Sequence, residues 1–120
     1  MKTTIKISIL SAICCMILGI TSTFAQTAGK KTETFKVYGN CDMCKDNIEG
    51  SLKKKEGIIS REWSPKTKML TVTYDASKIT STQLKQKIAD AGYDTDEIHA
   101  KEEAYNKLMK CCQYKRAKNN

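Results

Sequence analysis

The feature that most constrains the fold is a change of pattern near residue 40, where an alternating segment passes directly into a helical one. Residues 32–38 alternate between apolar and polar side chains, as in a half-buried strand. Apolar residues then recur at helical spacing over residues 42–55, and the helix is predicted to end near Gly57. Cys41 and Cys44 stand at the join, so the sequence predicts a strand, a loop with a CxxC motif, and a helix.

This join is suited to binding a soft metal. Cys41 is predicted to lie in the loop and Cys44 in the first turn of the helix. Free backbone N–H groups and the positive end of the helix dipole meet there, and both favour a thiolate over a thiol. Two thiolates on one short loop bind a thiophilic metal as a bidentate pair. Cys41 and Cys44 are therefore the first candidates for metal ligands.

The remaining patterns complete a small α+β domain. Two β-branched segments separated by a turn predict a hairpin, and a helical segment then begins with Ser81 or Thr80 as its cap and ends at Gly92. A short fourth strand follows. The predicted elements are strands at 58–63 and 68–74, a helix at 81–91 and a strand at 93–98. The order β-α-β-β-α-β predicts a ferredoxin-like sandwich, with two helices on one face of an antiparallel sheet.

The first 25 residues are predicted to be a secretory signal peptide. A basic start is followed by an apolar run at residues 7–20 and by small and polar residues before a cleavage site after Ala25. The run of about 14 residues is shorter than the roughly 20 that span a membrane, although an uncleaved anchor stays open. Export to the periplasm is therefore expected, with residues 26–31 as a linker.

Loss of the leader would leave four of the six cysteines and would lower the net charge of +8 by two. These cysteines form one CxxC and one adjacent pair, Cys111 and Cys112. Adjacent cysteines bridge each other only through a strained ring, so the pair suits joint binding better than crosslinking. A purely structural disulfide scaffold is the alternative for a small secreted chain.

Residues 32–98 resemble a heavy-metal-associated domain, the small metallochaperone module of copper chaperones, copper-pump N-termini and mercuric-ion-binding periplasmic proteins. The features that match are the strand–CxxC–helix join, the strand end Thr71-Val72-Thr73-Tyr74-Asp75 and the segment Ala91-Gly92-Tyr93. The resemblance implies that Cys41 and Cys44 are the metal ligands and that Tyr93 lies beside the metal. The export signal makes the mercuric periplasmic branch the nearest comparison.

One departure from that family concerns the loop itself. The family usually carries Gly-Met-x-Cys-x-x-Cys, and that Met packs under the loop. Here Gly39-Asn40-Cys41 lacks the Met and is one residue shorter. Met43, inside the CxxC motif, either packs inward or faces outward as a weak thioether contact.

Residues 99–120 form a tail that the domain does not require. Residues 101–114 predict a third helix with an apolar side. A helix of about 11 residues rises roughly 16 Å, about the length of a five-residue strand, so it can return along the open sheet face to the CxxC loop. We therefore expect Cys111 and Cys112 as additional ligands, around one metal with the CxxC pair or around a second ion. A surface helix that only packs is the alternative.

These features predict a binding protein with no catalytic step, which captures a soft cation and passes it on by ligand exchange. Two thiolates prefer Cu(I) or Hg(II), whereas four would suit Zn(II) or Cd(II). The expected partner is a membrane metal transporter or another metal-binding protein, and a metal-bridged dimer stays open. Nucleic-acid binding is not expected, since basic residues are not interleaved with aromatic ones.

Two alternatives belong to other functional classes. A periplasmic thiol–disulfide oxidoreductase would share the CxxC at a helix N-terminus, but Pro65, the only proline, falls in a hairpin turn. A redox-gated Zn or Cd protein would bind metal only when Cys41 and Cys44 are reduced.

Overall fold

The computed structural model describes residues 29–116. The predicted signal peptide and residues 26–28 of the predicted linker lie outside these residues, and residues 30 and 31 of that linker belong to the first strand. The sheet has three antiparallel strands in the order β1-β3-β2, namely β1 (Lys30–Lys36), β2 (Ile58–Trp63) and β3 (Met69–Asp75). The helices are α2 (Asp42–Gly50), α3 (Ser81–Asp90) and α4 (Glu102–Asn106), with 3-10 turns η1 (Lys54–Glu56) and η2 (Lys110–Cys112). Between residues 29 and 116, no helix is both long and apolar enough to cross a membrane.

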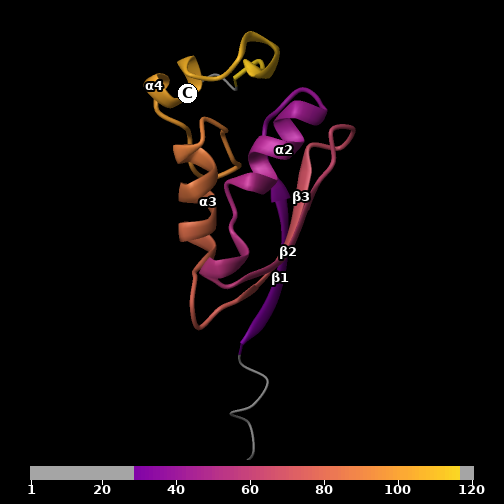
Figure 1. Cartoon of the computed structure of the whole chain (residues 1–120), viewed down its shortest axis with the longest axis vertical. Coiled ribbons are helices and arrows are strands. Elements are labelled where there is room, and N and C mark those ends of the chain that lie inside the picture. The colour runs from indigo at the N-terminus through magenta and orange to yellow at the C-terminus, as the bar shows by residue number, and fades with distance from the viewer. Residues whose placement is uncertain (1–28, 117–120) are drawn as a thin grey trace, which may run out of the picture.

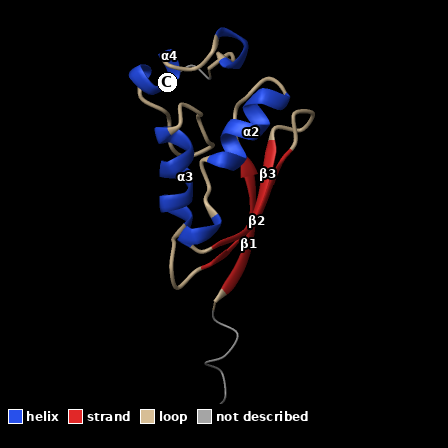
Figure 2. Cartoon of the chain, viewed as in Figure 1, coloured by secondary structure: helices blue, strands red, loops and turns tan. Residues whose placement is uncertain are grey.

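The two faces of the sheet differ as the alternating patterns predict. Helices α2 and α3 cover one face (Figure 1, Figure 2). The inward side chains of the strands are buried in the core with residues of these helices. On the other face, cross-strand pairs of threonine hydroxyls hydrogen-bond near solvent, Thr32 to Thr73 at 2.8 Å and Thr34 to Thr71 at 3.1 Å. The buried core includes Phe35, Val37, Ile48, Leu52, Trp63, Leu70, Val72, Tyr74, Leu84 and Ile88. The expected ferredoxin-like α+β class is therefore confirmed.

The two main helices differ in how well the sequence predicted their ends. Helix α3 begins with a capping box in which Thr80 and Gln83 satisfy each other's backbone N–H groups, as the cap prediction allowed. Helix α2 stops at Gly50 instead of continuing to residue 55. The Ser51 hydroxyl donates to the Ile48 carbonyl at 2.6 Å, and Lys53 is already extended. The local side-chain bond competes with continuation of the helix.

The predicted fourth strand at 93–98 is wrong. It is reduced to a single antiparallel bridge between Val37 and Thr95. The Thr95 hydroxyl accepts hydrogen bonds from the backbone N–H groups of Glu97 and Ile98, at 3.3 and 3.0 Å, which closes a tight turn. The chain therefore folds back at once, and the N–H of Ala100 donates to the Asp94 carboxylate at 2.7 Å.

The single helix predicted for residues 101–114 is also wrong. Helix α4 has only five residues, and Met109 is extended (φ −58°, ψ 148°) before η2 begins. The break lets both Tyr105 and Tyr114 pack against the core, from different parts of the tail. The tail does not lie on the open sheet face as expected. It crosses the end of the molecule at which α2 begins (Figure 1).

Candidate metal centre

The CxxC loop has the local geometry that the sequence predicted. Cys41 is the N-cap residue of α2, with extended backbone angles (φ −147°, ψ −175°), and its carbonyl accepts the first helical bond, from Lys45 at 3.1 Å. Cys44 lies in the first turn and is fully buried, whereas Cys41 is half-buried. The backbone N–H of Asn40 donates to Cys44 Sγ at 3.3 Å. The loop therefore presents two thiols at a helix N-terminus.

Trp63 packs directly beneath this loop. Its side chain is fully buried, and its indole Nε1 donates to the Val37 carbonyl at 2.9 Å. A Cβ atom on Gly39 would come within 3.0 Å of two ring atoms of Trp63 and 3.2 Å of the Cys44 Cβ. Glycine at 39 thus allows the loop to sit on the indole. In this chain, Trp63 supports a loop that lacks the methionine usual in the resembling family.

The tail brings a third sulfur into the site. The Sγ atoms of Cys41, Cys44 and Cys112 all lie within 4.8 Å of one another. Cys112 is fully buried. The neighbouring Cys111 is exposed and lies outside this group, with its thiol 3.6 Å from Met43 Sδ. The structure therefore brings together three of the four predicted cysteines and turns the fourth outward.

Two of these thiols, Cys44 and Cys112, differ in pKa. Burial pushes the pKa of Cys44 upward, but hydrogen bonds from the backbone of Asn40 and Cys41 and from the Cys112 thiol outweigh it, so the pKa lies below its ordinary value. Burial raises the pKa of Cys112 to about 12, and the neighbouring Cys44 adds to this rise. Cys44 is therefore more readily ionised than Cys112, which is a proton-bearing thiol beside it.

Tyr93 lies behind the third cysteine. Its hydroxyl accepts a hydrogen bond from Asn47 Nδ2 at 3.0 Å and contacts the Cys112 thiol. The same amide nitrogen lies 3.9 Å from Cys112 Sγ. Burial raises the pKa of Tyr93 far above its usual range. Tyr93 is therefore a neutral phenol packed against the sulfur cluster, and Asn47 orients it.

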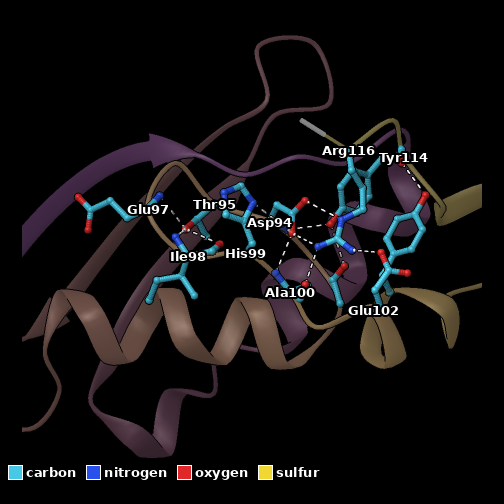
Figure 3. Close-up of polar contacts among 11 residues, drawn as sticks. Asp94, Thr95, Glu97, Ile98, His99, Ala100, Glu102, Tyr114 and Arg116 are labelled. Atoms are coloured by element: carbon cyan, nitrogen blue, oxygen red, sulfur yellow. Dashed lines mark hydrogen bonds and ion pairs between the residues drawn. The ribbon is translucent and has the colours of Figure 1, made fainter. Parts of the chain in front are cut away.

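A buried carboxylate fixes the tail in this position. The side chain of Asp94 is fully buried and accepts two hydrogen bonds from Arg116, at 3.0 Å from Nε and 2.9 Å from the terminal nitrogen (Figure 3). Burial acts to raise the pKa of Asp94, but the Arg116 guanidinium and the Ala100 N–H hold it below its usual range. We call Asp94, Arg116 and Ala100 the Asp94 latch.

Tyr114 makes a second attachment beside the latch. Its hydroxyl accepts from the N–H of Asp94 at 2.8 Å and donates to the carbonyl of Gly92 at 2.9 Å. Its ring stacks on Tyr93, with centroids 5.8 Å apart, and meets the edge of Tyr105 at 5.2 Å. Gly92 has a positive φ of 103°, and a Cβ there would lie 2.8 Å from the Ala104 carbonyl oxygen. The tail therefore packs on the domain through a closely fitted polar and aromatic contact.

Sequence reasoning missed the residues that hold the third thiol in place. Asn40 was read only as a departure from the family motif, yet its amide donates to the Cys111 carbonyl at 3.2 Å. Asp94 and Arg116 were not singled out. A carboxylate directly after an aromatic residue in a predicted strand was the available signal for Asp94, but nothing in the sequence indicates its partner 22 residues later.

The family model for the heavy-metal-associated domain matches residues 34–94, which include the CxxC loop, both main helices and all of β2 and β3. The chain belongs to this family. The match ends at Asp94, so the tail that supplies Cys112 lies beyond the shared domain.

Two curated relatives show how the chain compares in length. It is 38% identical to the copper chaperone CopZ of Staphylococcus saprophyticus over 64 residues, which are 52% of this chain and 94% of that protein. It is 36% identical over 69 residues to a zinc-transporting ATPase of Synechocystis, covering 57% of this chain but only 10% of the ATPase. The chain thus spans nearly all of the chaperone and a small part of the pump.

A solved structure extends the comparison to the fold. Oxidized MerP from Ralstonia metallidurans CH34 aligns with a TM-score of 0.52 at 29% identity, covering 56% of this chain and 94% of MerP. The covered part corresponds in extent to the shared domain. The expected resemblance to heavy-metal-associated domains is confirmed, since the chain is similar both to a copper chaperone and to MerP.

Proposed function

We propose that this protein is a metallochaperone or scavenger that binds one soft cation through the thiolates of Cys41, Cys44 and Cys112, with Cu(I) as the first choice. The observation that carries the proposal is the convergence of three sulfur atoms within 4.8 Å at a helix N-terminus. Ligand sulfurs on a three-coordinate metal with bonds of about 2.3 Å lie about 4.0 Å apart, so closure requires only small shifts.

The donor set decides between metals. Three thiolates suit trigonal Cu(I) or Hg(II), whereas Zn(II) and Cd(II) favour a fourth ligand. The fourth predicted ligand, Cys111, points away from the cluster toward Met43. The similarity to the CopZ copper chaperone also favours copper. Hg(II) remains the second choice, and the earlier expectation of a four-thiolate Zn or Cd site is the weaker alternative.

We propose further that the chain is exported and passes its metal to a metal transporter or to another metal-binding protein. The apolar segment at residues 7–20 supports export. The similarity to a zinc-transporting ATPase domain supports a transporter as partner. Transfer would proceed by ligand exchange, in which an incoming thiolate binds the metal before a thiolate of this chain leaves, so that no bare ion forms.

The test is to load the reduced full chain with Cu(I) under anaerobic conditions and to count its sulfur neighbours by X-ray absorption spectroscopy. We expect three sulfur ligands in the wild-type protein and two in Cys112→Ser, with an affinity at least about tenfold lower. Circular dichroism checks that the variant is folded. Two sulfurs in both proteins would remove Cys112 from the site, and no retained metal would contradict the proposal.

The oxidoreductase alternative is separated by the same preparation. A redox enzyme would catalyse the reduction of insulin disulfides by dithiothreitol at rates well above background, and Cu(I) would inhibit it. A metallochaperone would bind Cu(I) and leave the background rate unchanged. Pro65 lies in the turn between β2 and β3, whereas the CxxC motif lies between β1 and α2, which favours the metal function.

A further inference from the structure

We propose a second soft-metal site on the outer side of the three-cysteine cluster, formed by Met43 Sδ and Cys111 Sγ with Cys112 as a shared thiolate. It rests on the proposed function, because the shared thiolate exists only if the cluster takes up metal. The Cys111 thiol lies 3.6 Å from Met43 Sδ and 3.9 Å from Cys112 Sγ. Ligand sulfurs on one metal with bonds of about 2.3 Å lie about 3.8–4.0 Å apart, so binding one ion requires shifts of only a few tenths of an ångström in these two separations.

The outer sulfur atoms are held in place by the fold. Met43 lies on the first turn of α2, between the two cysteines of the CxxC motif. The carbonyl of Cys111 accepts a hydrogen bond from the Asn40 side chain at 3.2 Å and lies 4.0 Å from Cys41 Sγ. The Sγ atoms of the two adjacent cysteines thus lie side by side at the surface of the cluster, with Cys112 buried and Cys111 exposed next to Met43.

The exposure of Met43 supports a role outside the core. Its side chain is 42% exposed, although methionine is usually a core residue, and it is one of three large apolar residues with this degree of exposure in the described chain. A second is Met109, which is 59% exposed and belongs to the same tail. Met109 is not part of the proposed ligand set, so it provides a matched control for the loss of an exposed thioether.

The chemistry of this outer set favours a monovalent copper ion. Thioether and thiolate sulfur are soft ligands that select Cu(I), whereas Zn(II) and harder cations gain little from a thioether. A thiolate can bridge two such ions. Binding forms bonds from the metal to Met43, Cys111 and Cys112, releases the Cys111 proton to solvent, and changes no oxidation state. Because Cys44 and Cys112 are buried and the outer pair is exposed, an arriving ion meets the outer pair first.

The experiment is an anaerobic titration of the reduced full chain with Cu(I) against a chromophoric Cu(I) chelator. We expect two equivalents in the wild-type protein, the second bound more weakly. Cys111→Ser is expected to lose the second equivalent and keep the first, and Met43→Leu to weaken the second by about tenfold. Met109→Leu is expected to match the wild type. A copper–copper scattering path at two equivalents would mark the shared thiolate.

The outcomes separate this site from the proposed function. A wild-type chain that binds one equivalent overturns the outer site alone and leaves the three-thiolate site standing. Retention of two equivalents in both Cys111→Ser and Met43→Leu also overturns it. A chain that binds no Cu(I) overturns the proposed function, and the outer site with it. Urea unfolding of each variant confirms that a lost equivalent does not reflect a lost fold.

Discussion

The CxxC loop and the C-terminal tail both deliver cysteines to one place, but they do so by different means. Cys41 and Cys44 are three residues apart, and the N-terminal turn of α2 sets their separation. Cys112 is far away in sequence, and its position depends on the Asp94 latch and on Tyr114. The motif thus provides two sulfurs by local geometry, whereas the position of the third sulfur depends on polar contacts outside the motif.

The largest effect is expected from Cys44→Ser, which removes the buried sulfur of the loop. We expect Cu(I) affinity to fall by at least about a hundredfold, because the loop loses one of its two sulfurs and hydrogen bonds hold the pKa of this thiol below its ordinary value. Cys112→Ser is expected to lose affinity by a smaller factor, since the loop pair is intact. Competitive titration of the two variants makes the comparison. Equal losses would mean that the loop and the tail contribute alike.

Breaking the latch should change coordination without touching a ligand. Arg116→Ala leaves the fully buried Asp94 carboxylate without its charged partner, and we expect a loss of about 3 kcal/mol in the free energy of unfolding. The tail should then loosen, and the number of sulfur ligands should fall from three to two. Urea unfolding and X-ray absorption measure the two effects. Lys115→Ala is the control, since Lys115 is exposed. A sulfur count of three in Arg116→Ala would show that the tail does not need the latch.

Weakening the support of the loop should lower the stability of the fold without changing the number of sulfur ligands. Trp63→Phe removes the hydrogen bond to the Val37 carbonyl and leaves a small cavity under the loop, at a cost of about 2 kcal/mol. The tail contacts are untouched, so we expect three sulfur ligands in the folded variant. The same two measurements apply. A drop to two sulfurs would indicate that the tail depends on the loop, and the two regions would then form one unit.

The smallest effect is an acid dependence of the tail. The pKa of Asp94 is lower in the folded protein than in the unfolded chain, so its stabilising contribution is present above about pH 4 and is lost as the pH falls through the folded pKa. We expect the Tyr114 environment, followed by near-ultraviolet circular dichroism, to change in that range. Asp94→Asn should show less pH dependence there. An identical acid profile in both proteins would exclude the latch as its origin.

The contrast between loop and tail also explains what the sequence could predict. Cys41, Cys44 and the buried stripe of α2 follow from spacing within a few residues, and the hairpin and α3 follow from alternation and a capping pattern. The turn after Asp94, the break at Met109 and the pairing of Asp94 with Arg116 depend on tertiary contacts. The sequence correctly predicted that Cys112 lies near the CxxC loop. The prediction assumed a full fourth strand and an unbroken helix, however, and the structure contains neither in the tail that carries Cys112.

The position of Arg116 has a practical consequence for anyone who purifies this protein. The last described residues, up to Arg116, lie at the end of the domain that carries the sulfur cluster. Strand β1 begins at the opposite end (Figure 1). Imidazoles of a polyhistidine tag placed on the C-terminal side of Arg116 would follow the latch closely in sequence and would compete with the thiols for added Cu(I). Such a tag should therefore be removed before the protein is titrated with metal.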